Sequence, residues 1–537
     1  MNAAEAVGRT LARLGVRTAF GVVGSGNFHV TNALVAGGAR FVAARHEAGA
    51  VTMADGYARV GGEVGVVSVH QGPGLTNAMT GLAEAAKSRT PLVLLAGEVT
   101  SPRSNFYVDQ AGLAAAVGAV PMRVSSGADA VADTLRAYRT ALHERRTVLL
   151  NLPLDVHGEA APEISGLDLG APERVPVAGL DVLVSALEVA RRPVFVAGRG
   201  ARAARRELEA LAERTGALLA TSAVAKGLFR GNAWDLDVSG GFATPLAAEL
   251  IRGADLIVGW GCALNMWTMR HGTLIGPDAT VLQVDLDADA IGAHRPAQGV
   301  VGDVAEVARL ALAGVAAAAG YRSPELAARI DRERRWRDVP YDDWGKDGRI
   351  DPRTLSIALD DLLPADRLIA TDSGNFMGYP AMFMDVPDEQ GFVFTQAFQS
   401  IGLGLATAIG AALARPDRLP VAAVGDGGLL MGVAELETAV RLGLPLVVVV
   451  YDDEAYGAEV HHFGPDGYPL DTVTFPPADL AAIARGFGCA AVTVRSGEDL
   501  AGVAEWLAGP RELPLVVDAK VAADRGSWWL EEAFRGQ

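Results

Sequence analysis

Residues 421–457, VAAVGDGGLLMGVAELETAVRLGLPLVVVVYDDEAYG, combine two apolar strands with a helix between them. The first strand, residues 421–424, runs into a Gly-Asp-Gly turn that contains Asp426, and the second strand ends in Asp452-Asp453. A right-handed crossover makes two such strands parallel neighbours, so their carboxyl ends open on the same edge of the sheet, where ligands of these folds bind. We therefore expect Asp426 and Asp453 to converge, although they lie 27 positions apart.

Two carboxylates beside glycine-exposed amides are suited to Mg²⁺, a hard cation that prefers oxygen ligands and usually shares them with phosphate. A simpler interpretation is that the Gly-Asp-Gly segment is only a turn and that Asp453 is a solvated strand end. The strand–helix–strand context and the acidic pair together favour a metal site that contains Asp426 and Asp453.

The same alternation of short apolar strands and helical patterns extends over three blocks of the 537-residue chain, 1–165, 180–325 and 350–525. Domains usually hold ~100–200 residues, so about three are expected for this length. Strand–helix alternation is typical of parallel βαβ units. We therefore predict an α/β protein with three doubly wound parallel-sheet domains. The first and third blocks share their strand–helix rhythm, and a Pro- and Gly-containing linker, residues 160–179, follows the first block.

The composition excludes several classes of function. A formal net charge of −17 argues against nucleic acid or an anionic membrane as the main partner, although a metal and backbone amides could still hold a polyphosphate. The two cysteines, Cys262 and Cys489, make no disulfide framework and lack metal-ligand spacing. No apolar run reaches the ~18 residues of a membrane helix. The N-terminus has the pattern of an amphipathic helix rather than of a signal peptide, so we expect a soluble, cytoplasmic protein.

Residues 421–457 resemble the cofactor motif of the thiamine diphosphate enzymes of the acetolactate synthase, benzoylformate decarboxylase and benzaldehyde lyase group. In that motif Gly-Asp-Gly is followed after about 25–30 residues by Asn-Asn. The resemblance implies thiamine diphosphate and Mg²⁺ as cofactors, and pyrimidine-binding, central and diphosphate-binding domains in that order. This chain departs from the motif, because Asp452-Asp453 stands at the asparagine pair. The resemblance implies Asp426, Asp453 and the backbone carbonyl of Ala455 as metal ligands, with an added negative charge that should alter metal and diphosphate affinity.

A second motif lies in the first block, where RHEAGA and ADGYAR place Glu47 at the junction of a strand and a helix. In isolation such a glutamate is most often a helix-capping residue. The two segments resemble the activating-glutamate motif of the same family, which implies that Glu47 hydrogen-bonds the aminopyrimidine ring of the cofactor and shares a proton with it. Because the family builds its site from two subunits, the resemblance also implies a homodimer at minimum and commonly a homotetramer.

Further cofactor-binding residues follow from the resemblance. The segment FQSIGLGLATAIGAALARP resembles the Gly-rich segment of the family, and its Ile401 corresponds to the aliphatic residue that bends the cofactor, although a core isoleucine would be the simpler interpretation of this residue alone. Ser373 and Asn375, in ATDSGNF, follow a strand end and could hydrogen-bond the diphosphate, but such residues are also common in turns. The remaining cofactor-binding candidates are Gly425, Gly427, Gly428, Tyr456 and Gly457.

The loop HQGPGLTN places His70 where acetolactate synthases usually have a small polar residue and benzoylformate decarboxylase has a proton-shuttling histidine. A lone histidine is more often structural, but a loop beside Glu47 favours acid–base catalysis by a residue type that titrates near neutrality. The resemblance also implies that Ser25 contacts the substrate carboxylate and that Gln110 lies over the thiazolium ring. Glu459, His461 and His462 correspond to residues that line the substrate pocket; neighbouring histidines on a helix point apart, so they are not expected to share a metal.

Biosynthetic acetolactate synthases bind FAD through an RFDDR-like run in the central domain, whereas the corresponding stretch here, GWGCALNMWTMRHG, lacks that run, so FAD is not expected.

The leading prediction is a thiamine diphosphate-dependent carboligase or lyase that decarboxylates a 2-oxo acid such as pyruvate and transfers the acyl unit to an acceptor carbonyl. One alternative is a simple 2-oxo acid decarboxylase that uses His70 for protonation. Another is a non-catalytic paralogue that binds the cofactor, against which the intact Glu47, Asp426 and Ile401 argue.

Overall fold

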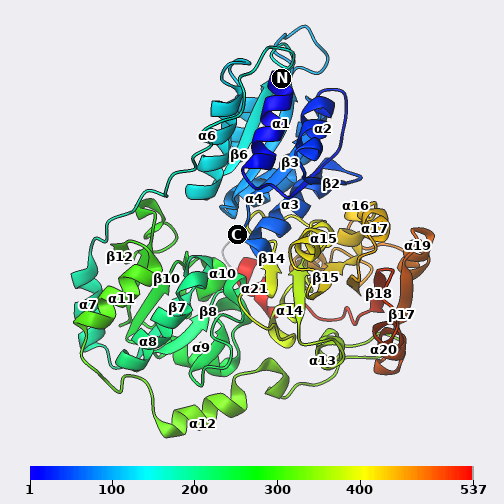
Figure 1. Cartoon of the computed structure of the whole chain (residues 1–537). Helices are drawn as coiled ribbons and strands as arrows, with labels where there is room; N and C mark the ends of the chain where they lie inside the picture. Colours follow the sequence, from blue (N-terminus) through cyan, green and yellow to red (C-terminus); the bar gives the residue numbers. More distant parts are fainter. Residues whose placement is uncertain (535–537) are drawn as a thin grey trace.

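The computed structural model describes residues 1–534, in which the chain forms three six-stranded parallel sheets with helices packed around them (Figure 1). The prediction of three doubly wound α/β domains is confirmed. In Figure 1 the N-terminal domain lies at the top, the central domain at the lower left and the C-terminal domain at the lower right.

In the N-terminal domain the strand order is β2-β1-β3-β4-β6-β5. The strands are β1 Thr18–Gly21, β2 Arg40–Ala43, β3 Gly65–Val69, β4 Leu92–Glu98, β5 Val120–Arg123 and β6 Thr147–Pro153. The helices are α1 Ala3–Arg13, α2 Phe28–Ala36, α3 Glu47–Gly61, α4 Pro73–Lys87, α5 Gln110–Ala116 and α6 Ala130–His143. Strands β3, β4 and β6 are buried along their whole length, which is why the sequence shows them as continuous apolar runs rather than as alternating patterns.

In the central domain the strand order is β12-β11-β10-β7-β8-β9. The strands are β7 Pro193–Ala197, β8 Leu218–Thr221, β9 Asp235–Val238, β10 Leu256–Trp260, β11 Thr280–Asp285 and β12 Gln298–Val301. The helices are α7 Leu180–Val189, α8 Arg205–Thr215, α9 Pro245–Arg252, α10 Met266–Met269 and α11 Val304–Gly314, and α12 Pro324–Glu333 lies in the connection to the next domain.

In the C-terminal domain the strand order is β14-β13-β15-β16-β18-β17. The strands are β13 Arg367–Thr371, β14 Phe392–Phe394, β15 Leu419–Gly425, β16 Val447–Asp452, β17 Ala490–Val494 and β18 Leu515–Lys520. The helices are α13 Pro352–Leu362, α14 Gly378–Phe383, α15 Gly404–Ala414, α16 Asp426–Gly432, α17 Glu435–Arg441, α18 Gly457–Phe463, α19 Leu480–Gly486, α20 Ala501–Ala508 and α21 Trp528–Phe534. The single helix expected between β15 and β16 is therefore two short helices, and the break follows Gly432, a residue of low helix propensity.

The N-terminal and C-terminal domains have the same topology. If the strands of each sheet are numbered from one along the chain, both sheets have the order 2-1-3-4-6-5. The tetrapeptide Ser-Gly-Asn-Phe occurs at residues 25–28 and again at 373–376, in each case after the first strand of its sheet. Helices α3 and α15 likewise follow the second strand of their respective sheets. This equivalence explains the strand–helix rhythm that the first and third sequence blocks share.

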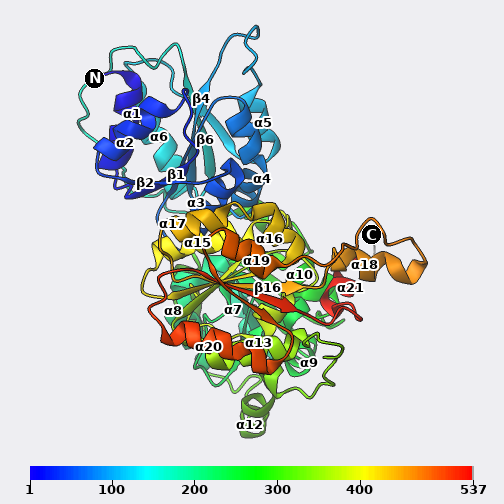
Figure 2. The same cartoon turned by 90° about the vertical axis from the view of Figure 1, so that its right-hand side faces the viewer.

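Helices α3 and α15 pack directly against each other and join the two outer domains, as Figures 1 and 2 show from two sides. A Cβ atom on Gly410 would lie 1.9 Å from the carbonyl oxygen of Met53, and one on Gly56 would lie 2.5 Å from that of Thr407. Glycine is therefore required on both helices at this close approach. One cluster of buried apolar side chains runs through both domains, from Phe20 in β1 to Val516 in β18.

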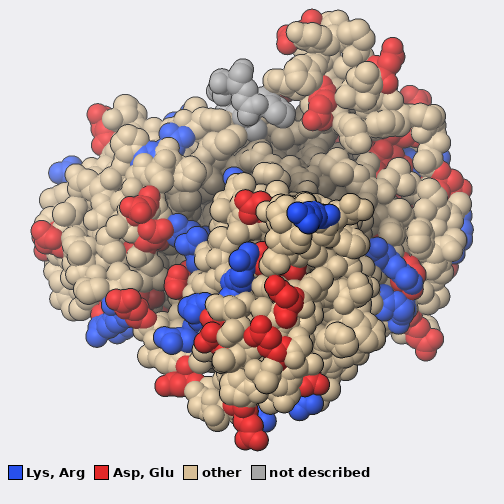
Figure 3. All heavy atoms as spheres, turned by 90° about the horizontal axis from the view of Figure 1, so that it is seen from above, with Lys and Arg blue, Asp and Glu red and all other residues tan. Residues whose placement is uncertain are grey.

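The length of the helices and the distribution of charged side chains on the surface bear on the prediction of which kind of partner the protein binds. None of the helices within residues 1–534 is long and apolar enough to span a membrane. On the face shown in Figure 3, acidic and basic side chains are interspersed and do not gather into a broad basic patch. Cys262 and Cys489 are both buried free thiols.

Candidate active site

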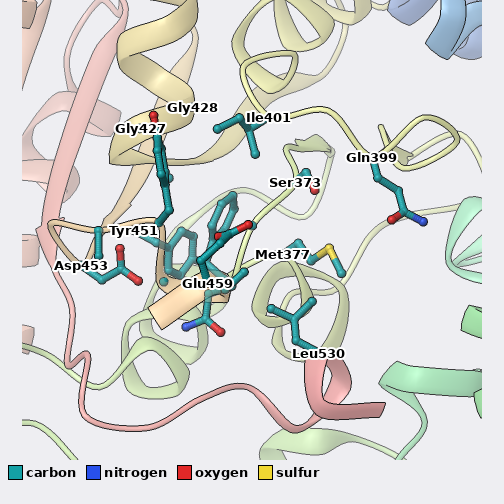
Figure 4. A pocket seen from close by; sticks show the side chains of 18 of the residues that line it. Ser373, Met377, Gln399, Ile401, Gly427, Gly428, Tyr451, Asp453, Glu459 and Leu530 are labelled. Carbon is teal, nitrogen blue, oxygen red and sulfur yellow. The ribbon is translucent and has the colours of Figure 1, made fainter. Parts of the chain in front are cut away.

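A cavity of about 550 Å³ opens at the carboxyl ends of β13, β15 and β16 (Figure 4). Asp426, at the end of β15, and Asp453, at the end of β16, both face this cavity, as the strand–helix–strand pattern predicts for one sheet edge. Twelve of the residues singled out from the sequence line it: Ser373, Asn375, Ile401, Gly425, Asp426, Gly427, Gly428, Asp453, Ala455, Tyr456, Gly457 and Glu459.

Glycines after β15 bring the backbone close to the cavity. A Cβ atom on Gly427 would lie 2.7 Å from the ring of Tyr456, and one on Gly428 would lie 2.6 Å from Oδ2 of Asp372. Because no side chain fits at either position, the wall here is main chain, which is the kind of surface that approaches a phosphate group closely.

Asp372, which no sequence motif singles out, organises the loop that carries Ile401. Its buried carboxylate accepts hydrogen bonds from the backbone nitrogens of Ser373 (2.9 Å), Gly402 (2.8 Å) and Leu403 (3.2 Å). Burial raises the pKa of Asp372 to about 6 although these hydrogen bonds favour the charged form. The available signal was its position, directly after β13 and before the Ser-Gly of the turn.

Asp426 and Asp453 are buried and influence each other electrostatically. Burial, helped by the carboxylate of Asp452, raises the pKa of Asp426 to about 7. Burial together with the carboxylates of Asp426 and Asp452 holds the pKa of Asp453 well above its usual range. A divalent cation between the two carboxylates would replace the protons that this arrangement favours.

The donor set fits Mg²⁺ that also binds a diphosphate. Two carboxylates and the backbone of Ala455 face one cavity, and all three offer oxygen ligands. Within residues 1–534 there is no group of three or more His, Cys, Asp or Glu side chains suited to a metal ion. A metal at Asp426 and Asp453 would therefore complete its shell with backbone, water or phosphate oxygens, as Mg²⁺ usually does.

Two predicted diphosphate ligands have protein partners at the cavity wall. The Oγ of Ser373 donates to Oε1 of Gln396 at 3.2 Å. The Oδ1 of Asn375 accepts hydrogen bonds from Oγ (2.6 Å) and the backbone nitrogen (3.3 Å) of Ser527. This contact ties the segment before α21 to the cavity wall.

Several residues of the cavity could not be found from the sequence because no motif marks them. Met266 and Trp267 reach the cavity from α10 of the central domain, and Leu530 reaches it from α21 near the C-terminus. Figure 4 shows Met377 and Leu530 on the side of the cavity opposite Gly427 and Gly428. They give the cavity an apolar wall facing its glycine-rich end.

Three predicted catalytic and substrate residues form a separate group in the N-terminal domain and do not line the cavity. The Oγ of Ser25 lies 3.3 Å from Nε2 of His70, whose Nδ1 lies 2.8 Å from the carbonyl oxygen of Gln71. The Oε2 of Glu47 accepts a hydrogen bond from Nδ2 of Asn77 at 3.1 Å. Gly74 separates the two side chains, since a Cβ atom there would lie 3.0 Å from Cβ of His70 and 3.5 Å from Oε1 of Glu47.

Gln110 is buried behind this group and supports its loop. Its Oε1 accepts a hydrogen bond from the nitrogen of Gly72 at 3.0 Å. Its Nε2 donates to the carbonyl oxygen of Gly97 (3.0 Å) and to Oδ1 of Asn151 (2.7 Å). The amide group thus holds the turn that follows His70, and a contact with the thiazolium ring stays a prediction.

On α18 the three predicted substrate residues separate. Glu459 lines the cavity, whereas His461 and His462 are not among its lining residues. His461 packs against Gly526, and burial lowers its pKa. A contact of either histidine with substrate stays a prediction.

Comparison with known proteins matches all three domains. Models of the thiamine pyrophosphate enzyme family match as the N-terminal TPP-binding domain at residues 1–117, the central domain at 180–310 and the C-terminal TPP-binding domain at 372–519. The chain is 32% identical to a probable 2-ketoarginine decarboxylase of Pseudomonas aeruginosa, over 93% of this chain and 90% of that protein. It is 29% identical to an acetolactate synthase large subunit of Parasynechococcus marenigrum (93% and 84% covered) and 29% identical to a sulfoacetaldehyde acetyltransferase of Castellaniella defragrans (93% and 90%).

Proposed function

This chain belongs to the thiamine pyrophosphate enzyme family, and from that premise we propose that it is a magnesium-dependent carboligase or lyase acting on a 2-oxo acid. The donor is decarboxylated, and its acyl unit passes to an acceptor carbonyl, as in acetolactate synthesis. The observation that carries the proposal is the cavity in which Asp426, Asp453 and Ile401 meet at one sheet edge.

Within this proposal each residue has a defined task. Asp426, Asp453 and the carbonyl of Ala455 would hold Mg²⁺, and the main chain at Gly427 and Gly428 would approach the diphosphate. Thiamine diphosphate held there would supply the carbon nucleophile and the electron sink that decarboxylation needs. The apolar wall excludes water from the reacting carbonyl.

A homodimer completes the site, and we include it in the proposal with the homotetramer as the common larger assembly. Glu47 must reach the same cofactor as Asp426, yet it does not line the cavity of its own chain. Exposed apolar side chains occur near the cavity and near the group formed by Ser25, Glu47 and His70. Met431 at the cavity is 64% exposed, and Phe28, three residues after Ser25, is 54% exposed. A second copy that brings its Glu47 group over this cavity would cover such side chains.

Simple decarboxylation is the second candidate, and one observation favours it. His70 lies 3.3 Å from Ser25 Oγ, so an imidazole stands next to the predicted substrate-carboxylate serine and can deliver a proton after CO₂ leaves. The 32% identical relative is named for decarboxylation of 2-ketoarginine, which supports including that acid among the donors tested.

Product analysis distinguishes the candidates. The purified protein is incubated with thiamine diphosphate, Mg²⁺ and a panel of 2-oxo acids that includes pyruvate and 2-ketoarginine, alone and with added aldehydes. Carboligation gives a new hydroxyketone product, whereas decarboxylation gives only CO₂ and the aldehyde. Absence of CO₂ release from every donor, in protein shown to hold the cofactor, would contradict both and would favour a non-catalytic binding protein. Glu47→Gln protein serves as the matched inactive control.

A further inference from the structure

A buried lysine, Lys520, lies at the carboxyl end of β18, behind the metal loop, the turn at residues 452–455 that carries Asp453 and Ala455. The Nζ of Lys520 forms a close ion pair with Asp452, lies 3.2 Å from Oδ1 of Asp518 and donates to the carbonyl oxygen of Ala478 at 3.0 Å. The side chains of Lys520, Asp452 and Asp518 are 5%, 2% and 1% exposed. Asp452 and Lys520 are register partners on the neighbouring strands β16 and β18, so the backbone ladder itself places them together.

The second oxygen of Asp452 shapes the turn that follows β16. Its Oδ1 accepts a hydrogen bond from the nitrogen of Glu454 at 3.1 Å, and Glu454 has a left-handed backbone with a φ of 58°. A non-glycine residue adopts this conformation only where its surroundings favour it. The same turn presents Asp453 and Ala455 to the cavity. Asp452 thus connects Lys520 on one side to the metal loop on the other.

The charge of this region explains why a cation is needed. The family motif has two neutral asparagines where this chain has Asp452-Asp453, so the pair adds two negative charges beside Asp426. A diphosphate adds more negative charge to the same cavity. Burying a carboxylate without a partner is strongly unfavourable. The positive charge of Lys520 is shared between Asp452 and Asp518, and its part at Asp452 offsets some of the added charge on the residue of the pair that does not line the cavity of Asp426 and Asp453.

We propose that Lys520 is a positioning residue of the metal site: by pairing with Asp452 it fixes the turn that carries Asp453 and Ala455, and it compensates the charge introduced by aspartate at the asparagine pair. The inference rests on the proposed function, since it takes Asp426 and Asp453 as metal ligands. Lys520 touches neither metal nor substrate and acts only through Asp452.

The test measures binding rather than turnover. Wild type, Lys520→Met, Asp452→Asn and the double variant are titrated with thiamine diphosphate at saturating Mg²⁺, and binding is followed by tryptophan fluorescence. Partners that orient metal ligands typically contribute about 10–100-fold in affinity, so Lys520→Met should bind at least about tenfold more weakly. Asparagine keeps the acceptor for the Glu454 nitrogen and removes one of the two buried carboxylates that lose Lys520, namely the one that shapes the turn. Asp452→Asn in the Lys520→Met background should therefore restore part of the loss.

A buried lysine elsewhere in the chain gives the control for general destabilisation. The Nζ of Lys226, in the central domain, is paired with Asp237 at 2.9 Å, and its side chain is 3% exposed. Lys226→Met should lower the melting temperature and leave cofactor affinity unchanged.

The outcomes separate the inference from the proposed function. Wild-type protein that binds no thiamine diphosphate with Mg²⁺ would overturn the proposed function and this inference with it. Wild-type binding with equal affinity in Lys520→Met would overturn only the inference. If Lys520→Met does not fold, recovery of folding and binding in the double variant supports the pairing, whereas no recovery overturns it. A loss of affinity of the same size in Lys226→Met also overturns it.

Discussion

Replacing Asp453 by asparagine should flatten the pH dependence of Mg²⁺ binding. In the wild type, burial raises the pKa of Asp426 to about 7 and holds that of Asp453 well above its usual range, with the neighbouring carboxylates contributing. Both carboxyl groups must lose a proton before they can bind the metal, so metal and protons compete. Asparagine, the residue of the family motif, leaves Asp426 as the single titrating ligand.

The magnitude follows from the pKa of Asp426. A group with a pKa of about 7 is roughly 90% ionised at pH 8 and roughly 10% ionised at pH 6, so this carboxyl alone weakens apparent binding about tenfold, or about 1.4 kcal/mol. Asp453, whose own pKa is raised, makes the wild-type dependence steeper. Between pH 8 and pH 6 we therefore expect the apparent Mg²⁺ affinity to fall by more than about tenfold in the wild type. In Asp453→Asn it should fall by about tenfold or less.

The stability of the metal-free protein changes in the matching direction. The raised pKa of Asp426 means that the folded state favours its protonated carboxyl. The contribution of this group to the free energy of unfolding is therefore fully present below the unfolded pKa of 3.8 and is lost as the pH rises through the folded pKa of about 7. Between pH 6 and pH 8 the melting temperature of the metal-free wild type should fall, and it should fall less in Asp453→Asn.

The assay is a Mg²⁺ titration at pH 6, 7 and 8 with saturating thiamine diphosphate, followed by tryptophan fluorescence. Protonation of the cofactor's own phosphates affects both proteins alike and cancels when their slopes are compared. Equal slopes for wild type and Asp453→Asn would refute the reasoning, because Asp453 would then not titrate in the metal site.

Three further predictions follow from the same geometry. Glu47→Gln should bind Mg²⁺ and thiamine diphosphate like the wild type, since glutamine can keep the contact with Asn77, but it should lose activation of the cofactor. Proton exchange at C2 of the thiazolium ring, measured by quenched NMR, should slow strongly, and an unchanged rate rules out this role of Glu47. His70→Ala should slow product protonation more than donor addition, as trapped intermediates would show; equal slowing of both steps counts against the assignment. Gly410→Ala should destabilise the fold by about 2–4 kcal/mol, because its Cβ would meet the Met53 carbonyl oxygen at 1.9 Å. Gly486→Ala, with open space around its Cβ, is the control in thermal melts, and equal effects would be inconsistent with the packing argument.

The sequence predicted which residues of the C-terminal domain line the cavity because strand order and the position of strand ends are linked. Asp426 and Asp453 end neighbouring parallel strands, so their convergence follows from the crossover rule. Ile401 and the glycines were placed by motif resemblance. The three-domain architecture could be predicted because buried parallel strands leave continuous apolar runs.

The remaining parts of the site had no sequence signal of this kind. Met266 and Trp267 reach the cavity from another domain, and their position depends on how two domains pack rather than on local pattern. The contact between Asn375 and Ser527 spans 152 positions, and the ion pair of Asp452 with Lys520 spans 68. Such pairs become visible only when tertiary structure brings separate strands and loops together.

The contact between α3 and α15 fixes, within one chain, the separation of two side chains that act on different cofactors in the proposed dimer. Glu47 is the first residue of α3, and Ile401 lies three residues before α15 begins. The glycine-to-backbone contacts at Gly56 and Gly410 therefore set the spacing between one active site and the next. A displacement of one helix would move Glu47 in one site relative to Ile401 in the other, so the two active sites of a dimer would be mechanically coupled through their shared helix pair.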